Sequence, residues 1–326
     1  MATTRHHAKG SRFTVIAAIG ANGAIAVVKF IAAFFTGSSS MLSEGVHSLV
    51  DTANEALLLL GISRSNRPPD KRHPFGYGIE LYFWSFVVAM LIFALGSGVS
   101  IYEGVLAFGA GHKVGSPIVA FVVLAAAFVF EGMSWTVAYR EFNTTRGERG
   151  FFQHFRAHKD PAVFIVLMED SAACIGVLIA ATSLALSLWT GDTRYDAAGS
   201  IAIGIVLGVT AYVLAYETKD LLIGEAANPE LSTEIRRMLQ DHPDVETVNE
   251  LRTLHLVPYE ILAVVSLDFA NGIPSERIET TVSDLERKIR MRFPDIRRVY
   301  IEAQDRQGHL ALAEQAVAAE GAPGGA

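Results

Sequence analysis

Six long apolar stretches dominate the first two thirds of the sequence. They cover residues 13–35, 39–62, 82–104, 116–139, 161–189 and 196–222. Each is long enough for a membrane helix, because about 20 mostly apolar residues cross the hydrocarbon core of a bilayer. Charged residues make up only 19% of the chain, against about 25% in soluble domains. We therefore predict a polytopic α-helical membrane protein with six transmembrane helices in contact with the lipid bilayer.

The charge changes after the last of these stretches. Residues 225–326 hold 18 acidic and 11 basic side chains and account for the whole net charge of −7. Helical and β-strand patterns follow in the order αββαβ, at 230–241, 245–256, 261–269, 275–293 and 299–303. We expect a transmembrane domain over 13–224, a small cytoplasmic α+β domain over 225–306 and a disordered tail over 307–326. No strongly basic balance indicates nucleic-acid binding.

Lysine and arginine are distributed unequally between the segments that connect the stretches. The N-terminal tail (1–12) and the second and fourth connections contain Arg5, Lys9, Arg12, Arg64, Arg67, Lys71, Arg72, Arg140, Arg146, Arg149, Arg156 and Lys159. The alternate connections contain only Lys113 and Arg194. Because basic loops remain in the cytoplasm, we predict that both termini are cytoplasmic. The single cysteine, Cys174, and the lack of a long Arg- and Ser-rich leader favour a bacterial inner (plasma) membrane over an organelle.

Ionisable residues inside the apolar stretches are the strongest functional feature of the sequence. They are Glu44, His47 and Asp51 in the second stretch, Glu131 in the fourth, and the adjacent Glu169 and Asp170 in the fifth. Such groups are costly in a bilayer and mark functional sites. Carboxylate oxygen and imidazole nitrogen suit zinc and similar divalent metals; the alternative is that these groups only hydrogen-bond one another. Lys29, near the end of the first stretch, is expected to extend to the membrane surface.

Two motifs around the second stretch carry a family resemblance. The first is SSSMLSEGVHSLVDTANEALLLLG at 38–61, and the second is PDKRHPFGYG at 69–78. Together with residues 166–176 and 195–200, they resemble the cation diffusion facilitator family, most closely its divergent branch that includes the mitochondrial-type zinc transporter. The resemblance implies a homodimer of six-span subunits with metallochaperone-like cytoplasmic domains. It also implies export of a divalent metal, usually zinc, in exchange for protons.

The resemblance further implies a set of metal ligands. The family takes two ligands from the second span, which correspond to His47 and Asp51, and two from the fifth, normally four residues apart. This sequence departs from that spacing, because its fifth span offers the adjacent Glu169 and Asp170. We hypothesise that Asp170 binds the metal directly and that Glu169 supports it or carries a proton. Accessory or proton-coupling roles are expected for Glu44 and Glu131. An oxygen-rich site would favour manganese, iron or cobalt.

The predicted cytoplasmic domain offers a weaker candidate metal site, which would use His255, Glu302 or Asp305. A packed domain that only dimerises is the simpler interpretation. For the whole chain we expect a secondary transporter and no enzyme, with zinc as cargo and not as a cofactor. Protons can act as counter-ion because histidine titrates near neutral pH. Two other classes are a non-transporting metal sensor or scaffold of the same fold and an intramembrane metallohydrolase, for which no His-Glu-x-x-His motif is present.

Overall fold

The computed structural model describes residues 4–110, 116–146, 161–257 and 260–320. The chain divides into two compact units, Met1–Leu222 and Ile223–Ala326, close to the change in charge after residue 224. Four basic residues used to predict the orientation, Lys113, Arg149, Arg156 and Lys159, lie outside the described residues.

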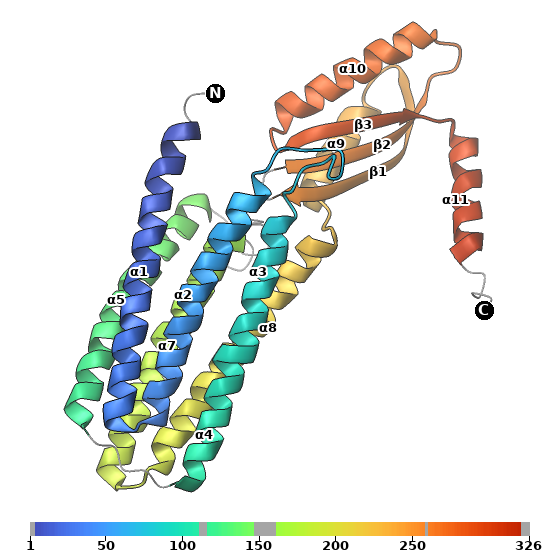
Figure 1. The fold of residues 1–326 in the computed structure, drawn as a ribbon. Coiled ribbons are helices and arrows are strands. Elements are labelled where there is room, and N and C mark those ends of the chain that lie inside the picture. The colour runs from blue at the N-terminus through green and yellow to red at the C-terminus, as the bar shows by residue number, and fades with distance from the viewer. Residues whose placement is uncertain (1–3, 111–115, 147–160, 258–259, 321–326) are drawn as a thin grey trace. The chain divides into compact units, whose positions relative to one another are not determined.

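Long helices form the first unit (Figure 1). They are α1 (Thr4–Thr36), α2 (Ser39–Ser65), α3 (Glu80–Leu91), the short π-helix η1 (Ile92–Ser97), α4 (Gly98–Ala110), α5 (Pro117–Arg146), α7 (Pro161–Thr190) and α8 (Arg194–Ile223). α2 is central, since it packs against α1, α3, α4 and α7. Gly37, with a φ of 66°, allows the tight turn between α1 and α2.

Four helices of the described residues are long and apolar enough to cross a membrane. They are Glu80–Gly109, Pro117–Thr144, Phe164–Thr190 and Arg194–Ile223. Residues Asn22–Thr36 of α1 form a shorter apolar helix. α2 is not among the four because Glu44, Asp51 and Glu55 recur along it. Four of the six expected spans therefore meet the requirement of length and composition.

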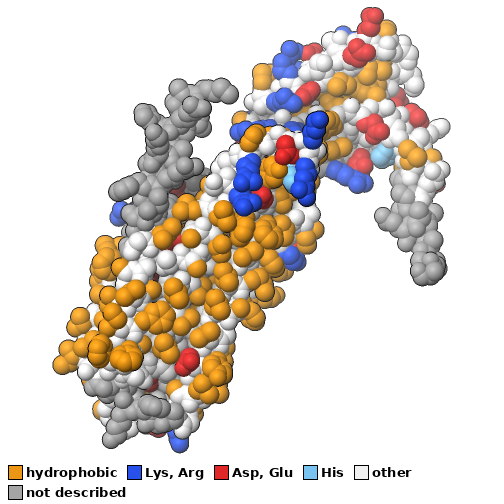
Figure 2. All heavy atoms as spheres, in the orientation of Figure 1, with side chains coloured by type: hydrophobic (Ala, Val, Ile, Leu, Met, Phe, Trp, Pro, Cys, Tyr) orange, Lys and Arg blue, Asp and Glu red, His pale blue; other side chains and the backbone are white. Residues whose placement is uncertain are grey.

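The first unit has an apolar surface and buries several charged side chains among apolar ones, unlike a water-soluble protein. Figure 2 shows hydrophobic side chains covering the visible face of its helices. Phe34 and Trp189 are 84% and 86% exposed, whereas Lys29 and Glu44 are fully buried. A protein surrounded by water rarely exposes many large aromatic side chains while it buries charged ones. The chain is an integral membrane protein.

Glycines bring α4 and α8 into close contact. A Cβ atom at Gly104 would lie 2.6 Å from a side-chain carbon of Ile201, and one at Gly204 would lie 2.6 Å from Ile101. Small residues at such crossings let helix backbones approach closely in a membrane. Gly104 and Gly204 therefore serve close packing of these two helices.

The second unit is a small sheet with helices. Its elements are α9 (Pro229–Gln240), β1 (Val245–Val257), β2 (Glu260–Phe269), α10 (Ser275–Arg292), β3 (Ile296–Ala303) and α11 (Arg306–Glu320). The sheet order is β1-β2-β3, with β1 antiparallel and β3 parallel to β2. Ile235 of α9 and Leu285 and Ile289 of α10 are buried against sheet residues such as Ala263 and Val265.

Asp244 connects the turn before β1 to α10. Its carboxylate accepts hydrogen bonds from Arg277 Nε and Thr281 Oγ1, both at 2.7 Å. The hydrogen bonds from Thr281 and Arg277 stabilise the ionised form and lower the pKa of Asp244. This contact helps to fix α10 to the rest of the unit.

The chain from residue 307 was expected to be a disordered tail, and the structure corrects this expectation. Helix α11 covers Arg306–Glu320, and only residues 321–326 of that segment are not described. The helix begins where the Asp305 carboxylate accepts a hydrogen bond from the backbone N–H of Gly308 at 2.9 Å. An N-terminal cap followed by an Ala-rich sequence favours helix despite the lack of apolar periodicity.

Candidate metal site

The start of α2 is fixed by a carboxylate of α8. Ser38 caps α2, since its Oγ accepts a hydrogen bond from Met41 N at 3.2 Å. Asp196 of α8 accepts hydrogen bonds from Ser38 Oγ at 2.7 Å, Ser39 N at 2.7 Å and Ser39 Oγ at 3.1 Å, and one from Ser40 Oγ. These bonds fix the first turn of α2, and with it the direction in which the polar side of the helix points.

The buried face of α2 is polar along most of its length. Its buried polar residues are Ser39, Ser40, Ser43, Glu44, His47, Ser48, Asp51 and Asn54. Spacings of three and four residues place them on one side of the helix. The first unit thus contains a file of polar groups within an apolar helix bundle.

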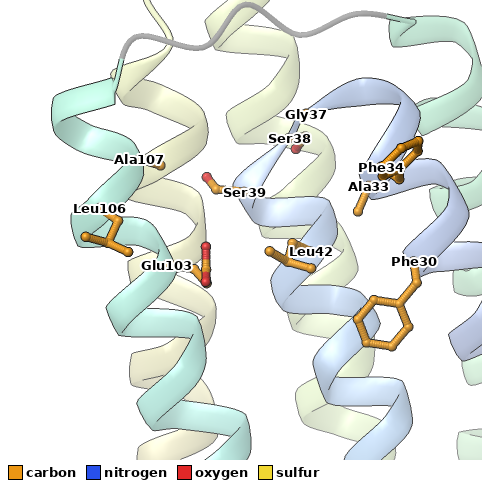
Figure 3. A pocket seen from close by; sticks show the side chains of 10 residues that line it. All are labelled: Phe30, Ala33, Phe34, Gly37, Ser38, Ser39, Leu42, Glu103, Leu106 and Ala107. Atoms are coloured by element: carbon orange, nitrogen blue, oxygen red, sulfur yellow. The ribbon is translucent and has the colours of Figure 1, made fainter.

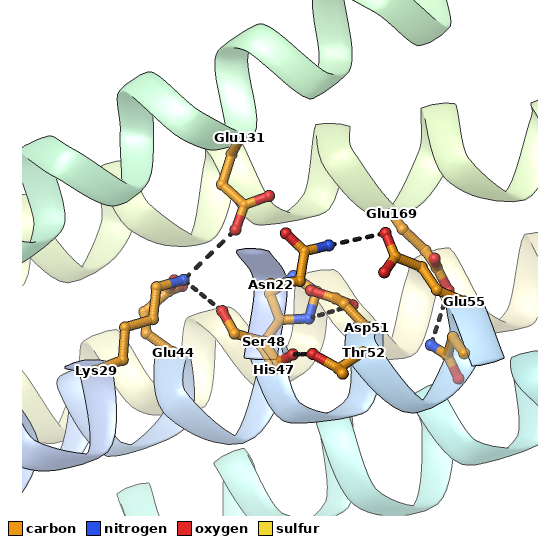
Figure 4. Close-up of polar contacts among 11 residues, drawn as sticks. Asn22, Lys29, Glu44, His47, Ser48, Asp51, Thr52, Glu55, Glu131 and Glu169 are labelled. Carbon is orange, nitrogen blue, oxygen red and sulfur yellow. Dashed lines mark hydrogen bonds and ion pairs between the residues drawn. The ribbon is translucent and has the colours of Figure 1, made fainter. Parts of the chain in front are cut away.

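His47 and Asp51 are neighbours in this file (Figure 4). His47 Nδ1 lies 3.3 Å from Asp51 Oδ1, and the two side chains are 1% and 11% exposed. Within the described residues, neither ring nitrogen of His47 nor Oδ1 of Asp51 has a hydrogen-bond partner. Buried polar atoms are nearly always satisfied, so these atoms are available to bind an ion.

The acidic pair of α7 faces two different helices. Asn54 Nδ2 of α2 donates a hydrogen bond to Glu169 Oε1 at 2.8 Å, whereas Ser134 Oγ of α5 donates one to Asp170 Oδ2 at 2.7 Å. Adjacent residues differ by about 100° around a helix, which explains the divergence. Glu169, and not Asp170, is the residue bonded to the helix that carries His47 and Asp51. This geometry does not favour the hypothesis that Asp170 is the more direct ligand.

Lys29 does not extend to the membrane surface, contrary to expectation. It is fully buried, and its Nζ lies 3.0 Å from Glu44 Oε2, 2.7 Å from Ser48 Oγ and 3.7 Å from Glu131 Oε1. Glu44 and Glu131, expected as accessory residues, therefore meet around one ammonium group (Figure 4). Opposite charges on Glu44 and Glu131 attract the ammonium into the bundle.

The candidate ligands do not form a closed coordination shell. Among the residues that the structure describes, no three His, Cys, Asp or Glu side chains are grouped closely enough to hold a metal ion together. His47 and Asp51 are in contact, but Glu169 and Asp170 are each hydrogen-bonded to a neutral side chain. The candidate donors lie on α2 and α7, and these side chains would have to move closer to one another to coordinate one ion.

Two hydrogen bonds of this region were not predicted. Asn54 links α2 to Glu169, and Asn22 Nδ2 of α1 donates a hydrogen bond to Glu55 Oε1 at 2.8 Å. The spacing 47, 51, 54 places Asn54 on the same helical face as the predicted ligands. That spacing was visible in the sequence, whereas the pairing of Asn22 with Glu55 depends on how α1 packs on α2.

The PDKRHPFGYG motif forms a hydrogen-bonded loop between α2 and α3. Asp70 accepts hydrogen bonds from Tyr77 Oη and His73 N, both at 2.7 Å, and from Arg72 N at 2.8 Å. The bond from the Tyr77 hydroxyl contributes most to lowering the pKa of Asp70, and the same bond raises the pKa of Tyr77. The motif thus has a structural explanation that requires no bound ion.

The weaker candidate site in the second unit is not assembled. His255 pairs with Ile261 at one end of β2, whereas Glu302 pairs with Ser266. Five residues of strand separate these positions by about 17 Å. Asp305 caps α11. Strand register therefore holds His255 and Glu302 apart, and the structure does not bring them together with Asp305 within one chain.

A pocket of about 530 Å³ lies at the Gly37 end of α1 and α2 (Figure 3). Its lining is largely apolar and consists of Phe30, Ala33, Phe34, Gly37, Ser38, Ser39, Leu42, Glu103, Leu106 and Ala107. Glu103 of α4 supplies its only acidic side chain among these residues. The pocket adjoins the Ser38–Ser39 end of the polar file.

Comparison with known proteins identifies relatives. The sequence profile of the cation efflux transmembrane domain matches residues 15–223. The chain is 35% identical over 263 residues to the mouse (Mus musculus) "Proton-coupled zinc antiporter SLC30A9, mitochondrial", an alignment that covers 80% of this chain and 46% of that protein. The chain thus spans about half the length of this relative.

Two further relatives come from a plant and a bacterium. The chain is 33% identical over 265 residues to metal tolerance protein C4 of Arabidopsis thaliana, covering 80% of this chain and 58% of that protein. It is 26% identical over 298 residues to the cation-efflux pump FieF of Pectobacterium atrosepticum, covering 87% of this chain and 90% of the pump.

Proposed function

The chain belongs to the cation efflux family, also called the cation diffusion facilitators, and from this premise we propose that it exchanges zinc for protons across a membrane. Transport of a metal cation follows from the family. Zinc as the cargo and protons as the counter-ion are supported by the name of the antiporter that is 35% identical. The proposed activity is that of a secondary transporter working by alternating access.

One observation carries the proposal for the site. His47 is buried in the bundle, its two ring nitrogens accept or donate no hydrogen bond among the described residues, and its Nδ1 lies 3.3 Å from Asp51 Oδ1. An unsatisfied imidazole in an apolar bundle costs free energy unless it binds something during function. We assign His47, Asp51 and Glu169 as metal ligands, with Asp170 completing the site when α5 and α7 move.

Proton exchange follows from the chemistry of these ligands. Imidazole and carboxylate must be deprotonated to bind a metal, so metal and protons compete for the same atoms. Protons that enter from one side would weaken the site and release the metal there. The same donor set is rich in oxygen, which supports manganese, iron or cobalt as a second candidate cargo.

The arrangement of the protein in the membrane is also a proposal. We place both termini in the cytoplasm because of the Lys and Arg distribution, with six spans that include α1 and α2 beside the four apolar helices. A homodimer is the expected assembly. The relatives come from mitochondria by name and from bacteria, and we retain the bacterial inner membrane as the expected location.

Flux measurements in liposomes test the function. The purified protein should move zinc in the presence of a pH gradient and should carry protons in the opposite direction. Parallel assays with manganese, cobalt and ferrous iron would rank the cargo. Zinc binding without flux of any of these metals would contradict the transporter and support a membrane metal sensor of the same fold.

A further inference from the structure

A buried cation already sits beside the proposed metal site. The Lys29 ammonium lies between Glu44 and Glu131, at 3.0 and 3.7 Å, and also donates a hydrogen bond to Ser48 Oγ at 2.7 Å. All three charged side chains are at most 7% exposed. The arrangement is a cation position built from α2 and α5 and filled by a side chain of α1 (Figure 4).

One carboxylate oxygen of this group is left unused. Glu44 Oε2 is paired with Lys29, but Glu44 Oε1 is buried and has no hydrogen-bond partner among the described residues. Gly176 of α7 leaves the space for it, because a Cβ atom there would collide with this oxygen. A buried carboxylate oxygen without a partner is costly, so its retention indicates that something binds it during function.

The position of this group along α2 places it next to the metal ligands. Glu44 precedes His47 by three residues, a rise of about 4.5 Å. It therefore lies one turn closer to the Ser39 end of the polar file and to the pocket lined by Glu103. An ion that left His47 and Asp51 in this direction would meet Glu44 next.

We propose that Glu44 and Glu131 form a transit site for the metal and that Lys29 is a tethered cation that keeps the metal from remaining there. The inference rests on the proposed function. With both carboxylates ionised, the group has a net charge of −1, and without Lys29 it would have −2, which matches a divalent cation. A positive charge a few ångströms away strongly opposes a second cation in a low-dielectric interior. Lys29 therefore makes the site weak enough to pass the ion on.

Equilibrium binding to the full-length protein in detergent tests this role. Calorimetry with zinc should show one more zinc per chain in Lys29→Met than in the wild type. The double variant Lys29→Met/Glu44→Gln should lose the additional zinc. Lys29→Arg is the matched control, because it retains the positive charge, and it should bind as the wild type does. An unaltered zinc stoichiometry in folded Lys29→Met would overturn the proposal and leave Lys29 a structural ion pair.

Flux in liposomes gives the second measurement. Lys29→Met should lower both the maximal rate and the half-saturating zinc concentration by about tenfold or more, because without the opposing charge the ion is held too tightly. If Lys29→Met does not fold, Glu131→Gln in the wild-type background should raise the half-saturating concentration, and unchanged kinetics in that variant would reject the transit site. Absence of zinc flux in the wild type would refute the proposed function instead, and additional zinc bound to Lys29→Met would still be measurable.

Discussion

Replacing Asp196 with alanine should loosen the start of α2. Asp196 is 4% exposed and accepts hydrogen bonds from Ser38, Ser39 and Ser40, including the backbone N–H of Ser39. Each hydrogen bond to a charged group contributes about 1.5–3 kcal/mol. The serine hydroxyls can rotate to other acceptors, whereas the backbone N–H cannot. We therefore expect Asp196→Ala to lower the free energy of unfolding by about 3 kcal/mol, roughly two of the bonds.

Thermal unfolding of the detergent-purified protein measures this effect. A loss of that size corresponds to a Tm lower by about 10 °C. Asp196→Asn keeps one acceptor oxygen and should lose about half as much. Asp192→Ala is the matched control, because Asp192 is exposed and its carboxylate accepts only the Arg194 N–H bond at 2.9 Å among the described contacts. A Tm for Asp196→Ala within the error of the Asp192→Ala value would refute the reasoning.

Three further predictions test individual contacts. If Glu169 faces the metal and Asp170 completes the site, Glu169→Gln should weaken zinc binding in calorimetry more than Asp170→Asn; the reverse order would restore Asp170 as the direct ligand. Gly176→Ala should destabilise the protein by about 1–3 kcal/mol because its methyl group collides with Glu44, whereas Gly132→Ala, which has open space, should not; equal Tm values would contradict the packing. Asp244→Asn should destabilise the second unit at pH 7. Since the folded pKa of Asp244 is lowered, this difference from the wild type should shrink as the pH falls through that pKa, and hydrogen exchange that shows a constant difference would exclude the linkage.

The sequence was most informative where a residue pattern is compatible with only one local structure. Apolar stretches of membrane length and the αββαβ patterns have counterparts in the helices and strands of the structure. The contact between His47 and Asp51 follows from their spacing of four on a helix. Such local features depend on residues that are close to one another in the sequence, and they can therefore be predicted from it.

Features that depend on packing between distant segments were not predictable. Lys29 was expected at the surface, but carboxylates from α2 and α5 hold it inside. Asp196 has its partners in Ser38–Ser40, more than 150 residues earlier. His255 and Glu302 do not meet within the chain because strand register, which the residue types do not specify, places them at different positions along β2.

The most direct test of the account is zinc binding and zinc flux by Asp51→Ala, measured on the same preparation. Asp51 is buried beside His47, with Oδ1 3.3 Å from Nδ1 and free of hydrogen bonds among the described residues. Its loss leaves too few donors for a four-ligand zinc site. We predict a folded protein that neither binds zinc at this site in calorimetry nor transports it in liposomes. A folded Asp51→Ala protein that binds and transports zinc at the wild-type rate would contradict the assignment of the site.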